Sequence, residues 1–242
     1  MQTACAHCPL RCLPQFEPMS EADAAFMQVI KRGEMVVDPG TTLFVEGASS
    51  PQLYTVLSGM GLRYKTLEDG RRQVVNFVFP GDYLGLQSAV MGEMRHSIEA
   101  STPMVLCVFN RSDLWEIFRN HPERAFSLTW LGSVEEHFLS DALATLGQRE
   151  AYERVAWALY RIWSRLAAME MVRDGSVPLP YRQRDLADAV GLSLVHTNKT
   201  LAKLRGAGIA DWRGGRLYVT DPLALAKIGA LEPDHIEPRP LF

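Results

Sequence analysis

The chain has 242 residues, which is long enough for two domains of ordinary size with a core each. It is 47% hydrophobic and 22% charged, and no apolar run approaches the roughly 18 residues of a membrane span. This composition is typical of a soluble, globular protein. Met1 to Leu13 has no apolar core like that of a secretory signal, so we expect a cytoplasmic protein. In that reducing compartment its four cysteines should be free, metal-bound or redox-active rather than paired in disulfides.

The net charge of −3 is unevenly distributed along the chain. Residues 182–216 hold seven basic and three acidic side chains, so this segment carries +4, whereas residues 1–181 carry −5. A local positive patch on an acidic chain is typical of a small DNA-contacting module. By itself, the same patch also fits an ordinary solvated helix face.

Short β-type runs separated by turn residues fill the region from Gly33 to Phe109. The candidate strands are Met35 to Val37, Thr42 to Val45, Leu53 to Leu57, Gly61 to Leu67, Gln73 to Phe79, Tyr83 to Leu86 and Met104 to Phe109. Turns such as Asp38-Pro39-Gly40 and Phe79-Pro80-Gly81 separate them at even intervals. This spacing predicts a compact antiparallel barrel or jelly roll.

A helical period replaces the strand pattern after Phe109. One apolar stripe recurs at helical spacing, and its members are Leu131, Val134, Phe138 and Ala142. A further helix is expected over about Arg149 to Met171, before Pro178-Leu179-Pro180 interrupts the chain. The last stretch, Glu232 to Phe242, contains three prolines and is expected to be a mobile tail.

A helix-turn-helix is predicted at Arg182 to Gly206. Gln183 to Val190 forms the first helix, and Gly191 allows the sharp turn that follows it. Ala187 is small enough for the second helix to cross closely. Ser193 is a natural N-cap for that second helix.

The second helix, Leu194 to Arg205, divides into two faces. The residues expected to pack on the first helix are Thr197, Thr200, Leu201 and Leu204. Leu194, Val195, Asn198, Lys199 and Ala202 fall on the opposite side, which is expected to lie in the major groove of DNA.

A basic hairpin follows the second helix. Two β-type runs flank Gly214-Gly215, and a hairpin in this position is a wing whose Arg213 and Arg216 can reach phosphates. The full set of expected DNA-contacting residues is Arg182, Arg184, Ser193, Leu194, Val195, His196, Asn198, Lys199, Lys203, Arg213 and Arg216. The alternative to DNA binding is a purely structural helical hairpin.

A glycine-punctuated β-roll, a long helix and a winged helix, in that order, resemble the Crp/Fnr family of bacterial transcription regulators, and more closely its Fnr-like branch. The resemblance rests locally on Phe79 to Gly85, which is similar to the family's Pro-Gly-acidic turn, and on Asp185 to Leu204. It implies an α+β fold with an N-terminal antiparallel β-roll of the cyclic-nucleotide-binding, jelly-roll-like type, a long central dimerisation helix and a C-terminal winged helix-turn-helix. The implied segments are a cysteine-containing arm (1–16), a β-roll sensor (17–109), a linker and dimerisation helix (110–147), a winged-helix DNA-binding domain (148–231) and a tail (232–242).

The resemblance also implies a homodimer that binds a palindromic operator in double-stranded DNA and acts on RNA polymerase. The stripe of Leu131, Val134, Phe138 and Ala142 is then the expected dimer seam, although such a stripe alone also fits a core-facing helix. In the second helix, Val195 stands where well-known members have a glutamate, and Lys199 and Leu194 stand where they have arginines. A half-site different from theirs is therefore predicted.

The signal has several candidate sites. The family's cyclic-nucleotide members hold their ligand with an acidic residue and an Arg-Ser pair, and here Asp82, Arg95 and Ser97 are the corresponding candidates for an effector pocket. Arg95 is one residue out of register, with His96 beside Ser97. The alternative interpretation is a surface arginine and a strand hydroxyl.

The cysteines are the more specific indication of a signal. Cys5, Cys8 and Cys12 cluster near the N-terminus, and Cys107 lies alone in a predicted strand. This set resembles the oxygen-sensing members, in which four such cysteines hold a [4Fe-4S] cluster. A Cys5-Cys8 redox pair and a metal-free chain with a buried Cys107 are the alternatives.

Two other classes of function compete with a regulator. An enzyme or small-molecule-binding barrel lacks support, because no catalytic triad pattern, phosphate-binding glycine loop or histidine-rich metal cluster occurs in the sequence, and no catalytic residue is predicted. An interaction scaffold would use the long helix without DNA, and only a regulator should show salt-sensitive, sequence-selective DNA binding.

Overall fold

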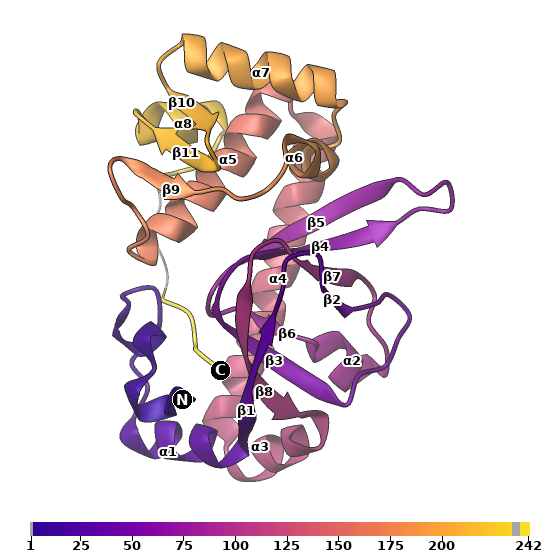
Figure 1. Ribbon diagram of the computed structural model, residues 1–242, viewed down its shortest axis with the longest axis vertical. Helices are drawn as coiled ribbons and strands as arrows, with labels where there is room; N and C mark the ends of the chain where they lie inside the picture. The colour runs from indigo at the N-terminus through magenta and orange to yellow at the C-terminus, as the bar shows by residue number, and fades with distance from the viewer. Residues whose placement is uncertain (1, 234–237) are drawn as a thin grey trace. The chain divides into compact units, whose positions relative to one another are not determined.

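The computed structural model describes residues 2–233 and 238–242 (Figure 1). Contacts divide the chain into two compact units. The first comprises Met1–Thr66, Val75–Glu136 and Pro238–Phe242, and the second comprises Leu67–Val74 and His137–Glu237. The division falls inside the long helix α4 (Pro122–Gln148). Among the described residues, no helix is both long and apolar enough to cross a membrane.

The first unit is built on two four-stranded sheets. One has the order β1-β8-β3-β6, with bounds Lys31–Val37, Met104–Asn110, Gln52–Ser58 and Tyr83–Leu84. The other has the order β2-β7-β4-β5, with bounds Thr42–Phe44, Ser97–Ala100, Gly61–Thr66 and Arg72–Val78. The ladders described between these strands are antiparallel, and the register of β3 on β8 pairs Thr55 with Cys107. The predicted antiparallel β-roll is confirmed, although strand β7 was not expected.

Short helices accompany these sheets. Two 3-10 turns in the N-terminal arm, η1 (Cys5–His7) and η2 (Pro9–Cys12), precede α1 (Glu21–Ile30), whose N-cap Ser20 accepts a hydrogen bond from the backbone N–H of Asp23. Helix α2 spans Leu86–Met91, and η3 (Arg111–Asp113) leads into α3 (Leu114–Asn120). The sequence pattern did not predict α1 or α2.

The second unit is a winged helix. Its elements are α5 (Ala151–Ala168), β9 (Ser176–Pro178), α6 (Gln183–Val190), α7 (Leu194–Gly206), β10 (Ala210–Arg213), β11 (Arg216–Val219) and α8 (Pro222–Ile228). The predicted hairpin β10-β11 is extended by β9, which pairs with β11 to give the order β10-β11-β9. Strand β9 and helix α8 were not predicted.

The apolar stripe expected as the dimer seam is partly used within the chain. Leu131 is 5% exposed and belongs to the core of the first unit. Phe138 stacks on Trp157 with ring centroids 5.9 Å apart. Leu131 is therefore buried within its own chain and has little surface left for a seam, whereas Phe138 is half-buried and its place in the seam stays a prediction. The exposed large apolar side chains of α4 are Phe126, Leu139 and Leu143.

The C-terminal tail departs from expectation at its end. Residues 234–237 lie outside the described part of the chain, but Pro238–Phe242 belongs to the first unit. Arg239, Leu241 and Phe242 are each less than 9% exposed. The prediction of mobility is therefore wrong for these last residues, because they are fixed by buried contacts.

Candidate DNA-binding interface and thiol site

Helices α6 and α7 pack through the residues that the sequence assigned to their shared face. Ala187, Thr197 and Leu204 are each at most 1% exposed. Gly191 ends α6 with φ of 65°, a left-handed conformation that costs other residues roughly 1–2 kcal/mol. The Ser193 hydroxyl accepts a hydrogen bond from the backbone N–H of His196, as expected of an N-cap.

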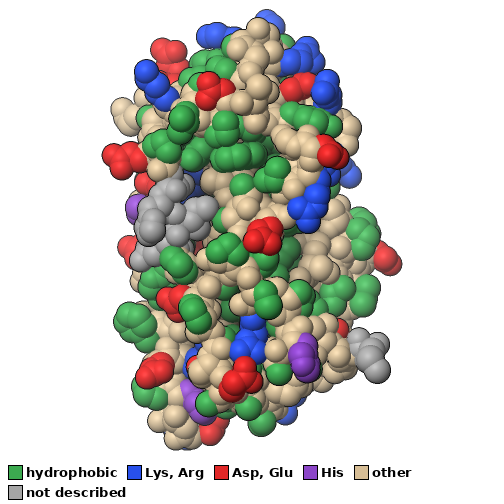
Figure 2. All heavy atoms as spheres, turned by 90° about the vertical axis from the view of Figure 1, so that its left-hand side faces the viewer, with side chains coloured by type: hydrophobic (Ala, Val, Ile, Leu, Met, Phe, Trp, Pro, Cys, Tyr) green, Lys and Arg blue, Asp and Glu red, His purple; other side chains and the backbone are tan. Residues whose placement is uncertain are grey.

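The opposite face of α7 is open to solvent. Leu194 is 43% and Val195 is 67% exposed, and the side chains of Asn198 and Lys199 are also exposed. Basic side chains are visible at the end of the molecule where α7 lies (Figure 2). This face can therefore meet another surface without unfolding any part of the domain.

The two wing arginines differ. Arg213 has an exposed side chain, which lies 3.4 Å from the Asp211 carboxylate and over the Tyr218 ring. The guanidinium of Arg216 instead donates to the hydroxyl and carbonyl of Ser176, at 2.7 and 3.0 Å. Arg216 thus joins β9 to β11, and its contact with phosphates stays a prediction.

The other predicted DNA-contacting cations lie on the surface. Arg182 and Arg184 are exposed at the start of α6, where Arg184 lies 3.9 Å from Asp188. Lys203 is exposed on α7, with its ammonium 4.1 Å from the centroid of the Tyr152 ring. Both contacts are weak surface interactions, so a DNA phosphate can replace them.

The three residues predicted for an effector pocket have separate partners. Asp82 is 1% exposed, and its carboxylate pairs with Arg239 at 3.1 Å. Arg95 is exposed and pairs with Glu93. Ser97 accepts a hydrogen bond from the backbone N–H of Glu46. Each of the three groups thus has its own partner within the chain, and a common effector pocket stays a prediction.

A buried histidine accompanies Ser97 on β7. His96 is 9% exposed, and its Nε2 atom has no hydrogen-bond partner among the described residues. Burial lowers the pKa of His96 to about 3, and the nearby charges of Arg63 and Lys65 act in the same direction. The imidazole is therefore neutral near pH 7. The sequence placed His96 beside Ser97 but did not indicate that it is buried.

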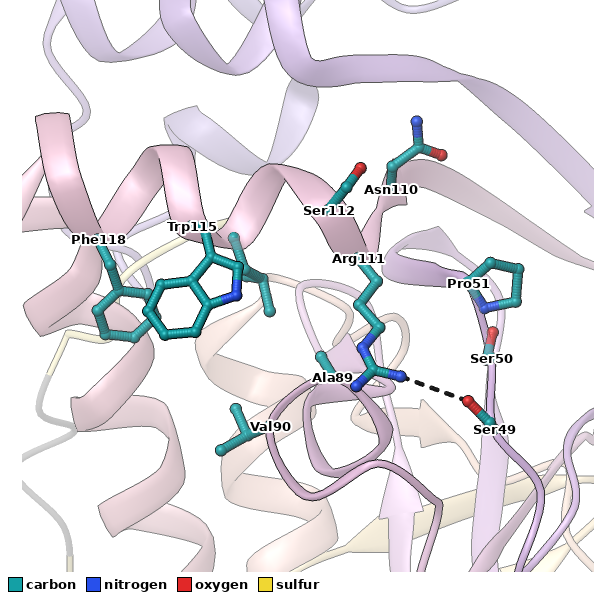
Figure 3. Close-up of a pocket in the computed structure, with 11 residues that line it drawn as sticks. Ser49, Ser50, Pro51, Ala89, Val90, Asn110, Arg111, Ser112, Trp115 and Phe118 are labelled. Carbon is teal, nitrogen blue, oxygen red and sulfur yellow. Dashed lines mark hydrogen bonds between the residues drawn. The ribbon is translucent and has the colours of Figure 1, made fainter.

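An open hollow of about 850 Å³ lies beside α2 and α3 (Figure 3). Val90, Trp115 and Phe118 form its apolar part, and Arg111 forms part of its polar edge, where the guanidinium donates to the Ser49 hydroxyl at 3.3 Å. None of the residues predicted for the effector pocket lines this hollow.

Three of the four cysteines lie around one small cavity, which we call the thiol cavity. Cys5, Cys8 and Cys107 line it together with Leu241 and Phe242, and its volume is about 30 Å³. Cys12 is exposed and does not line it. Burial raises the pKa of Cys107 to about 11 and also raises the pKa of Cys5, while Lys31 opposes both shifts. These two thiols are thus protonated at neutral pH.

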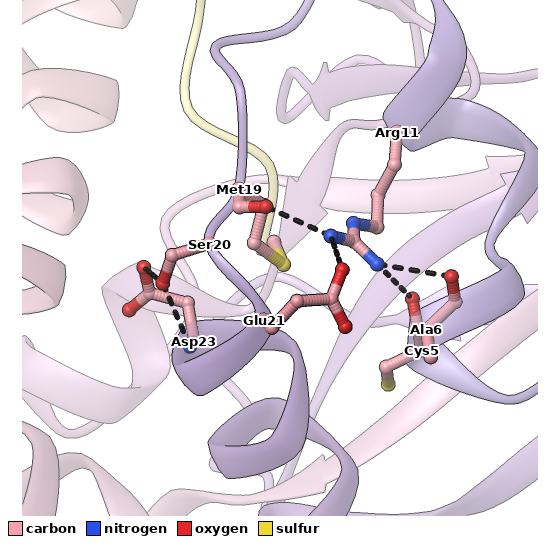
Figure 4. A network of polar contacts seen from close by, with 7 residues as sticks. All are labelled: Cys5, Ala6, Arg11, Met19, Ser20, Glu21 and Asp23. Carbon is pink, nitrogen blue, oxygen red and sulfur yellow. Dashed lines mark hydrogen bonds and ion pairs between the residues drawn. The ribbon is translucent and has the colours of Figure 1, made fainter.

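Arg11 fixes the cysteine arm (Figure 4). Its guanidinium donates to the carbonyls of Cys5, Ala6 and Met19, at 3.4, 2.9 and 2.8 Å. It also pairs with the exposed Glu21 carboxylate at 3.3 Å. One side chain therefore joins η1 to the start of α1. No sequence pattern indicated this role of Arg11, because three of these contacts are to backbone carbonyls.

The thiol cavity does not fit an iron-sulfur cluster as it stands. Thiols are the correct ligand type, but about 30 Å³ leaves room for only a few water molecules. Within residues 2–233 and 238–242, no three His, Cys, Asp or Glu side chains are arranged to hold a metal ion. Cluster binding would require Cys12 to approach and the wall formed by Leu241 and Phe242 to move.

Comparisons with known proteins agree with this architecture. Residues 34–121 match the cyclic nucleotide-binding domain, and residues 153–228 match the Crp-like helix-turn-helix domain. The transcriptional activatory protein AadR of Rhodopseudomonas palustris is 30% identical over 198 residues, which cover 82% of this chain and 81% of AadR. The chain belongs to the Crp/Fnr family. It is a transcription regulator with a DNA-binding helix-turn-helix, as predicted.

Two further comparisons place the chain near the Fnr-like members. The nitrogen fixation regulation protein FixK of Bradyrhizobium diazoefficiens is 29% identical over 226 residues, 93% of this chain and 94% of FixK. The structure of FixK2 from Bradyrhizobium japonicum superposes with a TM-score of 0.74 at 27% identity, and the match covers 82% of this chain and 98% of FixK2. These Crp/Fnr relatives are regulators rather than enzymes.

Proposed function

We propose that this Crp/Fnr regulator binds a palindromic operator as a homodimer, with α7 of each copy in the major groove of one half-site. The observation that supports this most directly is the open face of α7. In the described part of the chain, neither Asn198 nor Lys199 uses its side chain in a hydrogen bond or ion pair. Their polar groups are free to bind base edges.

The side chains on α7 limit what the half-site can be. Lys199 donates hydrogen bonds and suits the acceptor atoms of guanine, whereas Asn198 suits adenine. Val195 cannot accept a hydrogen bond, but it can contact a thymine methyl group. Arg182, Arg184 and Arg213 would hold the domain on the phosphates and add affinity without sequence preference.

The dimer contact is proposed for the exposed side of α4. Leu139 and Leu143 are one helical turn apart, and they are 44% and 73% exposed. Large apolar side chains grouped on an exposed helix face mark an interaction surface. In a parallel pair of helices they would interlock with the same residues of a second copy.

We extend the proposal to the signal, which would act on the thiols in a cytoplasmic regulator that contacts RNA polymerase. The support is that Cys107 lines the same cavity as Cys5 and Cys8, although about a hundred residues separate it from them in the sequence. The most specific form of this proposal is an iron-sulfur cluster held by these thiols and Cys12. Such a cluster would supply sensitivity to oxygen. The free thiols alone would supply sensitivity to oxidants.

Selection of bound sequences from random DNA tests the DNA-binding proposal. The expected product is a palindrome of two half-sites. On that sequence Lys199→Ala should lose about 1–3 kcal/mol of binding free energy, roughly 5- to 150-fold in Kd, together with discrimination at one base pair. Fluorescence anisotropy across a salt series measures both.

Lys227→Ala is the matched control, because Lys227 is an exposed lysine of α8 in the same unit. It should retain the selectivity of the unsubstituted protein. Equal effects of the two substitutions, or selection of single unpaired half-sites, would contradict the proposal.

Iron analysis and visible absorption of protein purified without oxygen test the cluster. Four iron atoms per chain are expected for the cluster, and Cys107→Ser should abolish them. A colourless, iron-free protein would reject the cluster. Thiol-dependent changes in DNA affinity would then decide whether the free thiols sense oxidants.

A further inference from the structure

The C-terminal segment Pro238–Phe242 is held on the β-roll in the manner of a bound peptide. Its backbone pairs with the N-terminal arm, where the N–H of Arg239 donates to the carbonyl of Gln15 and the N–H of Glu17 donates to the carbonyl of Arg239, at 3.0 and 2.9 Å. This gives a parallel bridge between Phe16 and Arg239. Main-chain pairing with pockets for side chains is a common mode of peptide recognition.

Arg239 supplies a charged anchor. Its guanidinium lies 3.1 Å from the Asp82 carboxylate, and the two side chains are 10% and 1% exposed. Asp82 also accepts a hydrogen bond from the backbone N–H of Phe79, in the turn that contains Gly81. The ring of Phe16 covers Gly81 so closely that an added Cβ would lie 2.1 Å from it. The anchor is therefore built into a tight turn of the β-roll.

The last two residues supply an apolar anchor. Leu241 packs in a cluster with Leu10 and Phe16. Phe242 lies in the core of the first unit, with its ring 5.2 Å from that of Tyr83 and 4.6 Å from the Arg124 guanidinium. Arg124 also donates to the carbonyl of Leu241 at 2.7 Å. Two buried side chains and a buried cation thus hold the end of the chain.

This end of the chain forms one wall of the thiol cavity. The Thr55 hydroxyl donates to the Phe242 carbonyl oxygen, and Thr55 is the cross-strand partner of Cys107. Leu241 and Phe242 line the cavity with Cys5, Cys8 and Cys107, and both are 5% exposed. Access to these sulfur atoms from this side therefore depends on two residues that lie more than a hundred positions after Cys107 in the sequence.

We infer that Pro238–Phe242 is a built-in peptide ligand of the β-roll that closes the thiol cavity, and that its release opens the cavity to reagents from solvent. The surface formed by Gln15, Phe16, Asp82 and Arg124 is thus a binding site for a peptide with an arginine three residues before a phenylalanine. The inference adds to the proposal about the signal. It rests on the proposed function only because it takes the thiols as the groups that sense the signal. It requires no metal.

The test compares alkylation rates of individual cysteines by N-ethylmaleimide in reduced, metal-free protein, followed by peptide mass spectrometry. The exposed Cys12 serves as an internal reference. Deletion of residues 238–242 should raise the rate at Cys107 relative to Cys12 by roughly tenfold or more, because a buried thiol reacts only during local opening. An unchanged ratio would overturn the inference.

Point variants separate release of the segment from damage to the fold. Phe242→Ala and Arg239→Gln should each raise the same ratio, whereas Arg95→Gln should leave it unchanged. Arg95→Gln is the matched control because it removes an arginine of an exposed ion pair from the same unit.

Rescue in trans completes the test. The peptide Pro-Arg-Pro-Leu-Phe, added to the shortened protein, should restore protection of Cys107, and the same peptide with alanine in place of arginine and phenylalanine should not. If only the deletion accelerates alkylation, and neither point variants nor peptide change the rate, the deletion has disrupted the β-roll and the inference fails. Iron content is a separate measurement, so failure of the cluster proposal would not be confused with failure of this one.

Discussion

The open face of α7 and the thiol cavity are two functional regions that are built in opposite ways. The face of α7 is made by one short helix, and its side chains, such as Val195 at 67% exposed, are directed to solvent. The thiol cavity is made by the N-terminal arm, strands β3 and β8 and the C-terminal segment, and its lining includes the buried side chains of Cys107, Leu241 and Phe242. The first region depends on local geometry, and the second depends on contacts between distant parts of the chain.

This difference predicts how the two kinds of region respond to change. A substitution on an open face alters what the protein binds and leaves folding almost unaffected, because exposed side chains contribute little to stability. A change of charge inside the closed β-roll alters the free energy of unfolding, because no water is available to solvate it. Measurements on one residue of each kind sharpen the comparison.

The largest effect is expected at the open face of α4. Leu143→Glu places a charge on a side chain that is 73% exposed, so the fold should persist while the dimer is lost. Operator affinity should fall roughly 100-fold or more, since two linked half-sites bind far better than one. Sedimentation velocity measures the dimer, and anisotropy measures the affinity.

Leu223→Glu is the control for this experiment. Leu223 is 66% exposed and lies on α8 in the same unit. Leu223→Glu therefore introduces the same negative charge at an exposed site outside α4. A dimer that survives Leu143→Glu would place the seam elsewhere. Extensive unfolding of Leu143→Glu would show that the open face of α4 is essential to stability. The contrast between open faces and the buried β-roll would then be wrong.

The face of α4 also shows a limit of sequence reasoning. Periodicity identified an apolar stripe of Leu131, Val134, Phe138 and Ala142, but a stripe does not say whether its partner is the same chain or a second copy. Leu131 is in the core of its own unit, and Phe138 stacks on Trp157. The exposed Leu139 and Leu143 lie beside that stripe.

Local features of the sequence predicted far more than long-range ones. The strands of the β-roll followed from regular turns, and the faces of α6 and α7 followed from Ala187, Gly191 and Ser193, since each acts within a few residues of its position. Strand β7, Ser97–Ala100, was missed because only Ile98 of its four residues is of a β-branched or aromatic type.

The thiol site could be predicted only in part. The spacing of Cys5 and Cys8 indicated a shared role, and the resemblance added Cys107. The three prolines of the tail, Glu232 to Phe242, did not indicate that its end would be buried. Proline restricts the backbone but does not determine which residues a segment contacts. The pairing of Asp82 with Arg239 joins residues 157 positions apart, beyond the reach of any local pattern.

The smaller expected effect is a loss of stability of the β-roll as the pH falls. The pKa of buried His96 is about 3, below the ordinary value of 6.5. As pH falls below 6.5 the unfolded chain takes up a proton at this residue and the folded chain does not, so the stability of the folded state falls. The loss has a limit of about 1.4 kcal/mol per pH unit, or roughly 2–3 kcal/mol between pH 6 and pH 4.

Hydrogen exchange of peptides from the β-roll, measured at several pH values, isolates this contribution. His96→Asn should remove most of the pH dependence that the histidine supplies in that window, since asparagine does not titrate there. His137→Asn should leave it in place, because the side chain of His137 is 74% exposed and exposed side chains contribute little to stability. If His96→Asn and the unsubstituted protein lose stability equally between pH 6 and pH 4, the imidazole is protonated in the folded state, and the β-roll around β7 is open to water rather than closed.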